Sequence, residues 1–200
     1  MTADVDVTDH RPKRSDALVR RIAIHEASHA VARLVFDLDT VTGISIDAFH
    51  GGYVVAQTDV YHENTLEFLS ALLAFMLAGR AGEEEFLGSA GANNNGETVG
   101  SDHESATKLA YDMETSMGFA EDMPLLYRRC EDWAHHLATN PKLAAKVNRR
   151  LEEAYAVARK VVRAQAAAVS YLRDQLMAHG TLEGPELKAV LAETRKLIKR

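Results

Sequence analysis

The heptapeptide Ile24–Ala30, IHEASHA, contains two histidines separated by three residues, with a glutamate directly after the first. Apolar residues surround this motif, and the pattern predicts a helix that Ser15 or Asp16 can cap and that runs to about Asp37. Positions i and i+4 of a helix share a face, so His25 and His29 should point the same way. We therefore expect the fold to be organised around this helix.

Two imidazoles on adjacent helical turns can bind one metal ion, and zinc binds neutral imidazole readily. Glu26 is the next residue round the helix, where it can reach a water molecule beside the metal and take its proton. Burying these three side chains without such a partner would cost free energy. The motif predicts a hydrolase with His25 and His29 as zinc ligands and Glu26 as the general base.

A third ligand is also required, because a catalytic zinc site uses three protein ligands and keeps one position for water. Two groups of residues are candidates on their chemistry. Glu83, Glu84 and Glu85 lie near the end of a second predicted helix, and Asp102, His103 and Glu104 open a third. Spacing along the chain does not choose between these groups.

The composition of the 200 residues restricts the class of protein. A chain of this length suits one domain. A net charge of −6 with interspersed signs argues against nucleic acid as a partner. One cysteine, Cys130, excludes an internal disulfide and fits a reducing compartment. The N-terminus lacks an apolar signal segment, and the longest apolar stretch, residues 66–79, is too short to cross a bilayer. We therefore expect a soluble, cytoplasmic protein.

Turn and cap signals divide the rest of the chain. We expect a disordered lead over residues 1–14 and one domain over residues 15–200. We expect two strands within 41–60, broken by Gly51-Gly52, and then a helix from the Asn64 capping box to Gly88. A mobile loop over 88–100 and a helix from Ser101 to Gly118 should follow. The rest should be helical over 122–178, restarting at Asn140-Pro141, with a last helix after Gly184-Pro185. The predicted fold is mainly α with one small β-sheet.

Three ordered motifs carry a resemblance to a known family. HEASHA resembles HEAGHA, and LAGRAGEEEFLG at 77–88 is similar to G-G-R-A-A-E-E. VGSDHESATKLAYDMETSMGF at 99–119 is similar to T-G-A-S-N-D-L-x-x-A-T-x-x-A-x-x-M-V-x-x-Y-G-M, and the end of the chain resembles T-L-x-G-x-E-L. Over about residues 18–190 the chain resembles the peptidase domain of the FtsH-type, membrane-bound AAA proteases. The resemblance implies a zincin-like HExxH helix followed by a C-terminal helical bundle.

The resemblance also implies roles for single residues. The family's third zinc ligand is the aspartate four residues before an Ala-Thr pair, which corresponds to Asp102 here. The implied centre is Zn²⁺ on His25, His29 and Asp102, with Glu26 as base. A carboxylate among Glu83–Glu85 could orient a ligand imidazole. The family binds substrate along a sheet edge, and Gly52, Tyr53 and Val54 lie in the matching segment.

Departures from the family pattern shape the functional hypothesis. Ser28 replaces a glycine, and helix propensity alone suggests little effect. The GANNNGE loop differs from the family's run beside the metal, and the 200 residues contain no G-x-x-x-x-G-K phosphate loop. We predict a zinc metalloendopeptidase of flexible or unfolded polypeptides without its own ATPase motor. The expected partners are a polypeptide substrate, a separate ATPase or full-length protease, and, by resemblance, a homo-hexamer.

The alternative hypothesis keeps the fold but not the activity. In this interpretation the chain is a catalytically weak or inactive module that interacts with, or regulates, full-length proteases. The missing motor and the altered loop favour it. The presence of all four chemical residues in the sequence favours the enzyme.

Overall fold

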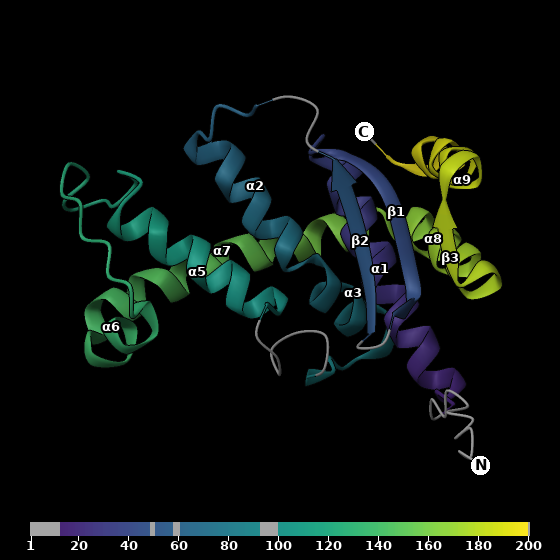
Figure 1. Ribbon diagram of the computed structural model, residues 1–200, viewed down its shortest axis with the longest axis horizontal. Coiled ribbons are helices and arrows are strands. Elements are labelled where there is room, and N and C mark those ends of the chain that lie inside the picture. Colours follow the sequence, from purple (N-terminus) through teal and green to yellow (C-terminus); the bar gives the residue numbers. More distant parts are fainter. Residues whose placement is uncertain (1–12, 49–50, 58–60, 93–99, 200) are drawn as a thin grey trace, which may run out of the picture.

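The computed structural model describes residues 13–48, 51–57, 61–92 and 100–199 (Figure 1). Helices predominate beside one small sheet, as predicted. The helices are α1 (Asp16–Val35), α2 (Leu66–Met76), α3 (Ala78–Leu87), α5 (Asp102–Thr115), α6 (Trp133–Thr139), α7 (Pro141–Ala164), α8 (Ala166–His179) and α9 (Gly184–Leu197). The strands are β1 (Thr40–Ala48), β2 (Gly51–Gln57) and β3 (Thr181–Glu183).

The sheet is antiparallel, with the strand order β2-β1-β3. Ile44 in the central strand pairs with Val54 on one side and with Leu182 on the other. The predicted break at Gly51-Gly52 is displaced, because both glycines belong to β2. No sequence pattern indicates β3, since its three residues, which lie between Gly180 and Gly184, are too few to show strand alternation. In the described part of the sheet, β2 is an edge strand.

Side-chain caps fix most helix starts as the sequence predicts. Ser15 accepts a hydrogen bond from the Leu18 backbone N–H at 3.2 Å, and Asn140 accepts one from the Leu143 N–H at 3.1 Å. The cap of α2 is Thr65, one residue after the predicted start, because Asn64 takes a left-handed backbone conformation with φ 48°.

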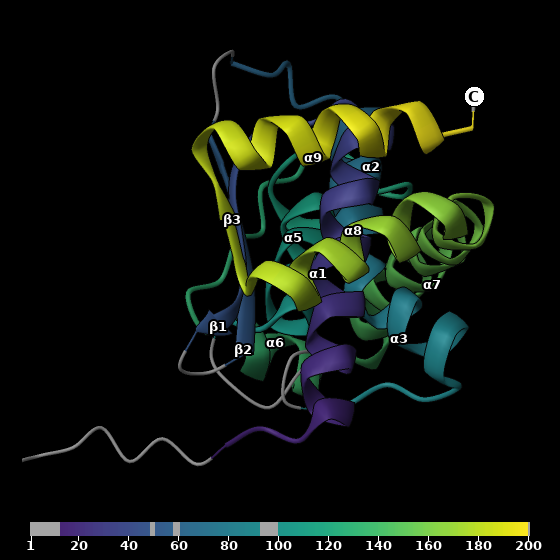
Figure 2. The same cartoon turned by 90° about the vertical axis from the view of Figure 1, so that its right-hand side faces the viewer.

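The long helices expected from sequence are interrupted. The helix predicted over 64–88 divides at Leu77 into α2 and α3. The helix predicted from 141 to 178 divides at Gln165. The side-chain NH2 of Gln165 donates to the Lys199 carbonyl, and its side-chain oxygen accepts from the Lys199 N–H. These tertiary bonds let α8 turn away from α7 and pack beside α9 (Figure 2).

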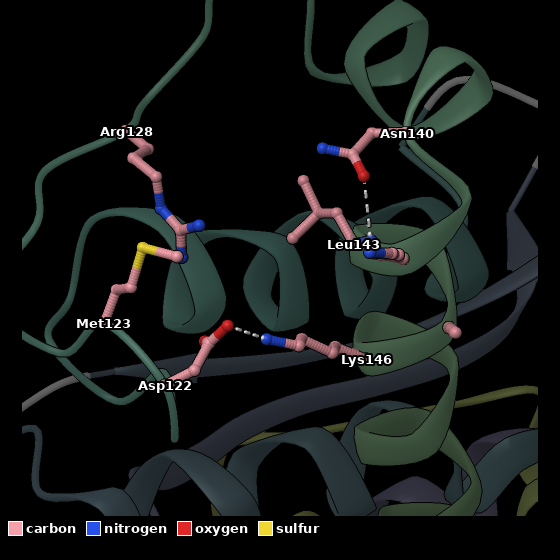
Figure 3. A pocket seen from close by; sticks show the side chains of 8 residues that line it. Asp122, Met123, Arg128, Asn140, Leu143 and Lys146 are labelled. Carbon is pink, nitrogen blue, oxygen red and sulfur yellow. Dashed lines mark hydrogen bonds and ion pairs between the residues drawn. The ribbon is translucent and has the colours of Figure 1, made fainter.

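The prediction of helix over residues 122–132 is wrong, since these residues are irregular. Pro124 disfavours helix at the preceding residue. Arg128 is held by long-range bonds, its backbone N–H donating to the Thr115 carbonyl and its guanidinium to the Glu114 carbonyl at 2.9 Å. Asp122 pairs with Lys146 of α7 at 2.5 Å. The segment and the start of α7 line a pocket (Figure 3) that shares no residue with the site described below.

Helix α1 lies at the centre of the molecule and contacts α2, α3, α7, α8, β1 and β2 (Figures 1 and 2). Residues on one side of α1, such as Ala27 and Val31, pack in a hydrophobic core with β1, α8, β3 and α9. Ala32 joins a second core formed with α2, α3, α5 and α7. The HExxH motif is therefore held between two packed layers. None of the helices in the described ranges has both the length and the apolar composition needed to cross a membrane.

Candidate metal centre

The three polar residues of the HExxH motif are buried. The exposed fractions are 2% for His25, 5% for Glu26 and 5% for His29. Polar groups at this depth need partners. The two imidazoles sit on one face of α1, with ring centroids 4.7 Å apart.

Three ligating atoms converge at this face. The Nε2 atoms of His25 and His29 lie 3.1 Å apart, and Asp102 Oδ2 lies 2.9 Å from the first and 3.0 Å from the second. In the described part of the chain these residues form a group of the kind that can hold a metal ion. Two imidazole nitrogens and a carboxylate oxygen suit zinc and related transition metals.

Asp102 reaches this position because it is the first residue of α5. Ser101 caps the helix, accepting a hydrogen bond from the Glu104 N–H at 3.4 Å, and Glu104 Oε2 accepts one from the Gly100 N–H at 2.5 Å. Both bonds fix the first turn that carries the carboxylate. A helix N-terminus also favours the ionised form of Asp102.

The other candidates for the third ligand lie elsewhere. Glu84 pairs with Arg80 at 3.0 Å, and Glu85 pairs with Arg159 and Arg163 of α7 at 2.7 and 2.8 Å. Glu83 meets His25 at Nδ1, the ring nitrogen opposite the convergent atoms, at 2.8 Å. Of the carboxylates that sequence spacing left open, Asp102 is the one whose oxygen meets both Nε2 atoms.

The Nδ1 atoms fix how both rings present their other nitrogen. His25 Nδ1–H donates to Glu83 Oε1, and His29 Nδ1–H donates to the Phe75 carbonyl at 2.9 Å. A neutral imidazole that donates from Nδ1 carries its lone pair on Nε2. Two lone pairs and a carboxylate oxygen then face one point, which is the arrangement that a cation satisfies.

Without a metal ion, the electrostatics of the protein favour a proton in the place of that cation. Burial lowers the pKa of His25, but hydrogen bonds to Asp102 and Glu83 outweigh it and raise this pKa to about 10. Burial would raise the pKa of Asp102, yet the two histidines hold it well below its usual range. Burial also raises the pKa of Glu26, which suits a group that must accept a proton. The carboxylates of Asp102 and Glu83 thus stabilise a positive charge at the histidine that lies between them.

Two glycines of α3 allow the helix backbone to approach this face, a role that sequence reasoning missed. A Cβ at Gly79 would lie 2.4 Å from His25 Nε2 and 2.5 Å from His29 Nε2. A Cβ at Gly82 would lie 2.0 Å from Oγ of Ser28. The only sequence signal is the three-residue spacing of the glycines in GRAG, which places both on one helix face.

The predicted substrate segment lies on the edge strand beside Glu26. A Cβ at Gly52 would lie 2.6 Å from Glu26 Oε1. Tyr53 is 39% exposed, and Val54 packs against the core of α1 and α8. Since the Val54 side chain faces inward, this part of the segment could contact a peptide only through its backbone.

Comparison with known proteins gives a consistent assignment. The model of peptidase family M41 matches residues 14–190. The chain is 26% identical to the ATP-dependent zinc metalloprotease FtsH of Cupriavidus metallidurans, over 90% of this chain and 30% of that protein. It is 28% identical to the protein of the same name from Thermotoga maritima, over 91% of this chain and 33% of that protein. It is 30% identical to the protein of the same name from Syntrophus aciditrophicus, over 86% of this chain and 25% of that protein.

The chain thus spans a third or less of the length of these curated relatives. The family match, in contrast, extends over the helix with the histidines, the glycine-bearing helix against it, the helix that begins at Asp102, helices α7 and α8, and the first part of α9. The chain belongs to peptidase family M41.

Proposed function

We propose that this chain is a zinc-dependent endopeptidase that hydrolyses peptide bonds of flexible or unfolded polypeptides. The observation that carries the proposal is the convergence of His25 Nε2, His29 Nε2 and Asp102 Oδ2 within 3.1 Å of one another, with Glu26 beside them. The relatives named above are zinc metalloproteases, which supports the choice of metal and of reaction.

The donor atoms fit zinc in number, kind and spacing. Zn–N and Zn–O bonds of about 2.0–2.2 Å in a tetrahedron place neighbouring ligand atoms about 3.3–3.5 Å apart. The observed separations of 2.9–3.1 Å are shorter by only a few tenths of an ångström. Three protein ligands also leave one tetrahedral position for water or substrate.

The roles of the residues follow from their positions. When bound, zinc supplies a Lewis acid that lowers the pKa of a water molecule to about 7 and polarises a carbonyl. Glu26 then takes the proton from the attacking water and passes it to the leaving amine. Glu83 and the Phe75 carbonyl keep the two imidazoles in one orientation and tautomer.

Strand β2 supplies the surface for an extended peptide. It pairs with β1 on one side, and its other side is the described edge of the sheet. A peptide added there as a further strand would be held through backbone groups, with little preference for side chains. Gly52, Tyr53 and Val54 are the residues that we assign to this contact. Folded proteins keep most of their backbone in paired or packed segments, so flexible or unfolded chains are the proposed substrates.

The test is cleavage of an unstructured protein, casein, by zinc-loaded protein with the Glu26→Gln variant alongside. We expect the wild type to cut and Glu26→Gln to keep zinc without cutting. Zinc bound one per chain without cleavage by either protein would contradict the endopeptidase proposal and favour the interaction module. Loss of zinc from Glu26→Gln would show that Glu26 has a structural role and would overturn its assignment as base.

We also propose that the chain assembles into a sixfold ring or docks on a separate ATPase or full-length protease. The irregular segment after α5 supports a contact of this kind. It exposes a run of apolar side chains, namely Met123, Leu125, Leu126 and Tyr127, with exposed fractions of 47%, 99%, 52% and 70%. Such a run on a monomer's surface marks a site of association.

A further inference from the structure

Arg21 lies one helical turn before the first histidine, and its guanidinium contacts the carboxylate that holds that histidine. Arg21 Nη1 donates to Glu83 Oε2 at 2.6 Å, and Glu83 Oε1 accepts from His25 Nδ1–H at 2.8 Å. The Glu83 side chain is fully buried, whereas Arg21 is 26% exposed. Arg21 and His25 are four residues apart on α1, so their side chains lie on one face of the helix and both contact the Glu83 carboxylate.

Residues that follow α3 also bind Glu83 and Arg21. The Gly91 backbone N–H donates to Glu83 Oε2 at 2.7 Å. Arg21 binds Ser89 twice, with Nη1 donating to its carbonyl at 2.6 Å and Nη2 to its hydroxyl at 3.1 Å. Glu83 is therefore held on both oxygens. Burial raises its pKa, but the bonds from His25, Arg21 and Gly91 lower it to about 2.

We infer that Arg21 is a positioning residue of the metal centre, acting through Glu83 on the orientation of His25. The inference rests on the proposed zinc site. An ion pair between exposed groups contributes little, but this pair has a fully buried carboxylate. Without Arg21 the Glu83 carboxylate loses a charged donor and can rotate away from His25 Nδ1. The His25 ring then loses the bond that aims its Nε2 at the metal.

The first experiment measures zinc affinity of the full chain by competition with a chromophoric chelator. Loss of a residue that supports a ligand costs about 10- to 100-fold in metal affinity. We expect Arg21→Met to lose at least tenfold and Arg21→Lys, which keeps a charged donor, to recover most of it. Arg20→Met is the matched control, because Arg20 is the exposed neighbour on the same helix. Equal affinity of the Arg21→Met and Arg20→Met proteins would overturn the inference.

The second experiment separates positioning from general stability. In a Glu83→Gln background, Arg21→Met should have almost no further effect on zinc affinity, because the residue acts through that carboxylate. The Co²⁺-substituted protein should show an altered visible absorption spectrum in Arg21→Met and an unaltered one in Arg20→Met. Losses that simply add in the double variant, or an unaltered cobalt spectrum in Arg21→Met, would show that Arg21 only stabilises the fold.

The outcomes distinguish this inference from the proposed function. A wild-type protein that binds no zinc contradicts the zinc site itself. A wild type that binds zinc and an Arg21→Met variant that binds it equally well contradict only the role of Arg21.

Discussion

Gly52 lies directly against Glu26. A carbon added at Gly52 would lie 2.5 Å from Cγ and 2.6 Å from Oε1 of Glu26, and 2.7 Å from the Ser45 carbonyl oxygen. The edge strand that we propose as the substrate contact therefore also forms one wall around Glu26, the proposed general base. A side chain at position 52 would compete with the carboxylate for the same space.

Gly52→Ala should lower kcat/KM for an unstructured substrate while the protein still binds zinc. The added methyl group displaces the Glu26 carboxylate or the strand, and a misplacement of about 1 Å can cost about 100-fold in rate. Steady-state kinetics and zinc content of the two proteins measure the effect. Gly43→Ala is the matched control, because a Cβ at Gly43 in the neighbouring strand would meet other atoms only at 3.8 Å or more. A Gly52→Ala enzyme as active as Gly43→Ala would show that the base tolerates another position.

Asp102→Asn should weaken zinc binding by about two orders of magnitude. A neutral amide replaces the charged oxygen that lies within 3.0 Å of both histidine nitrogens. Dialysis against a weak chelator followed by metal analysis measures the loss. Glu104→Gln removes a charge from the same helical turn but keeps a side-chain oxygen that can accept the Gly100 N–H, so it should keep zinc. If Asp102→Asn also keeps its zinc, the third ligand lies elsewhere and Glu83 becomes the candidate.

Association should depend on the apolar run after α5. Leu125 is almost completely exposed, so Leu125→Glu should leave the fold intact and abolish assembly by placing a charge in the contact. Light scattering at working concentrations should give a hexamer mass for the wild type and a single-chain mass for Leu125→Glu. Tyr61→Glu, at a fully exposed residue before α2, is the control. A single-chain mass for the wild type would contradict the sixfold ring.

The motif helix was predictable because its signals are local. The i, i+4 spacing of His25 and His29 and the cap at Ser15 depend on residues within one helix, and the structure reproduces both features. Asp102 was different, because its distance from the histidines depends on how α5 packs. The motif resemblance singled it out, and the structure places its Oδ2 within 3.0 Å of both histidine Nε2 atoms.

The features missed from sequence depend on tertiary contacts. Residues 122–132 have helical composition, yet bonds from Arg128 to α5 hold them irregular. At the division between α7 and α8, Gln165 bonds to Lys199, which lies far along the chain. The choice of Glu83 over its two neighbours as the partner of His25 depends on the rotation of α3. Apart from Pro124, which disfavours helix at the residue before it, local patterns carry no information on these features.

Ser28 and Gly82 are in contact, and relative to the family motifs the larger residue is at position 28 and the glycine is at position 82. HEAGHA has glycine where Ser28 stands, and G-G-R-A-A-E-E has alanine where Gly82 stands. Here Oγ of Ser28 donates to the Ile24 carbonyl at 2.7 Å and fills the space that a methyl group at position 82 would need. Helix propensity, on which the expectation for Ser28 rested, does not include this contact between α1 and α3.

Gly82→Ala should therefore destabilise the protein by up to about 2 kcal/mol, because overpacking costs about 1–3 kcal/mol and the better helix propensity of alanine offsets only about 1 kcal/mol of it. Adding Ser28→Gly should restore most of that loss, although Ser28→Gly alone is destabilising. Urea unfolding of the metal-free protein measures all four free energies without a contribution from bound zinc. A coupling free energy above about 1 kcal/mol would establish that the two positions share one space. If the two single effects simply add, the helices adjust independently, and the small residues at these positions are unrelated.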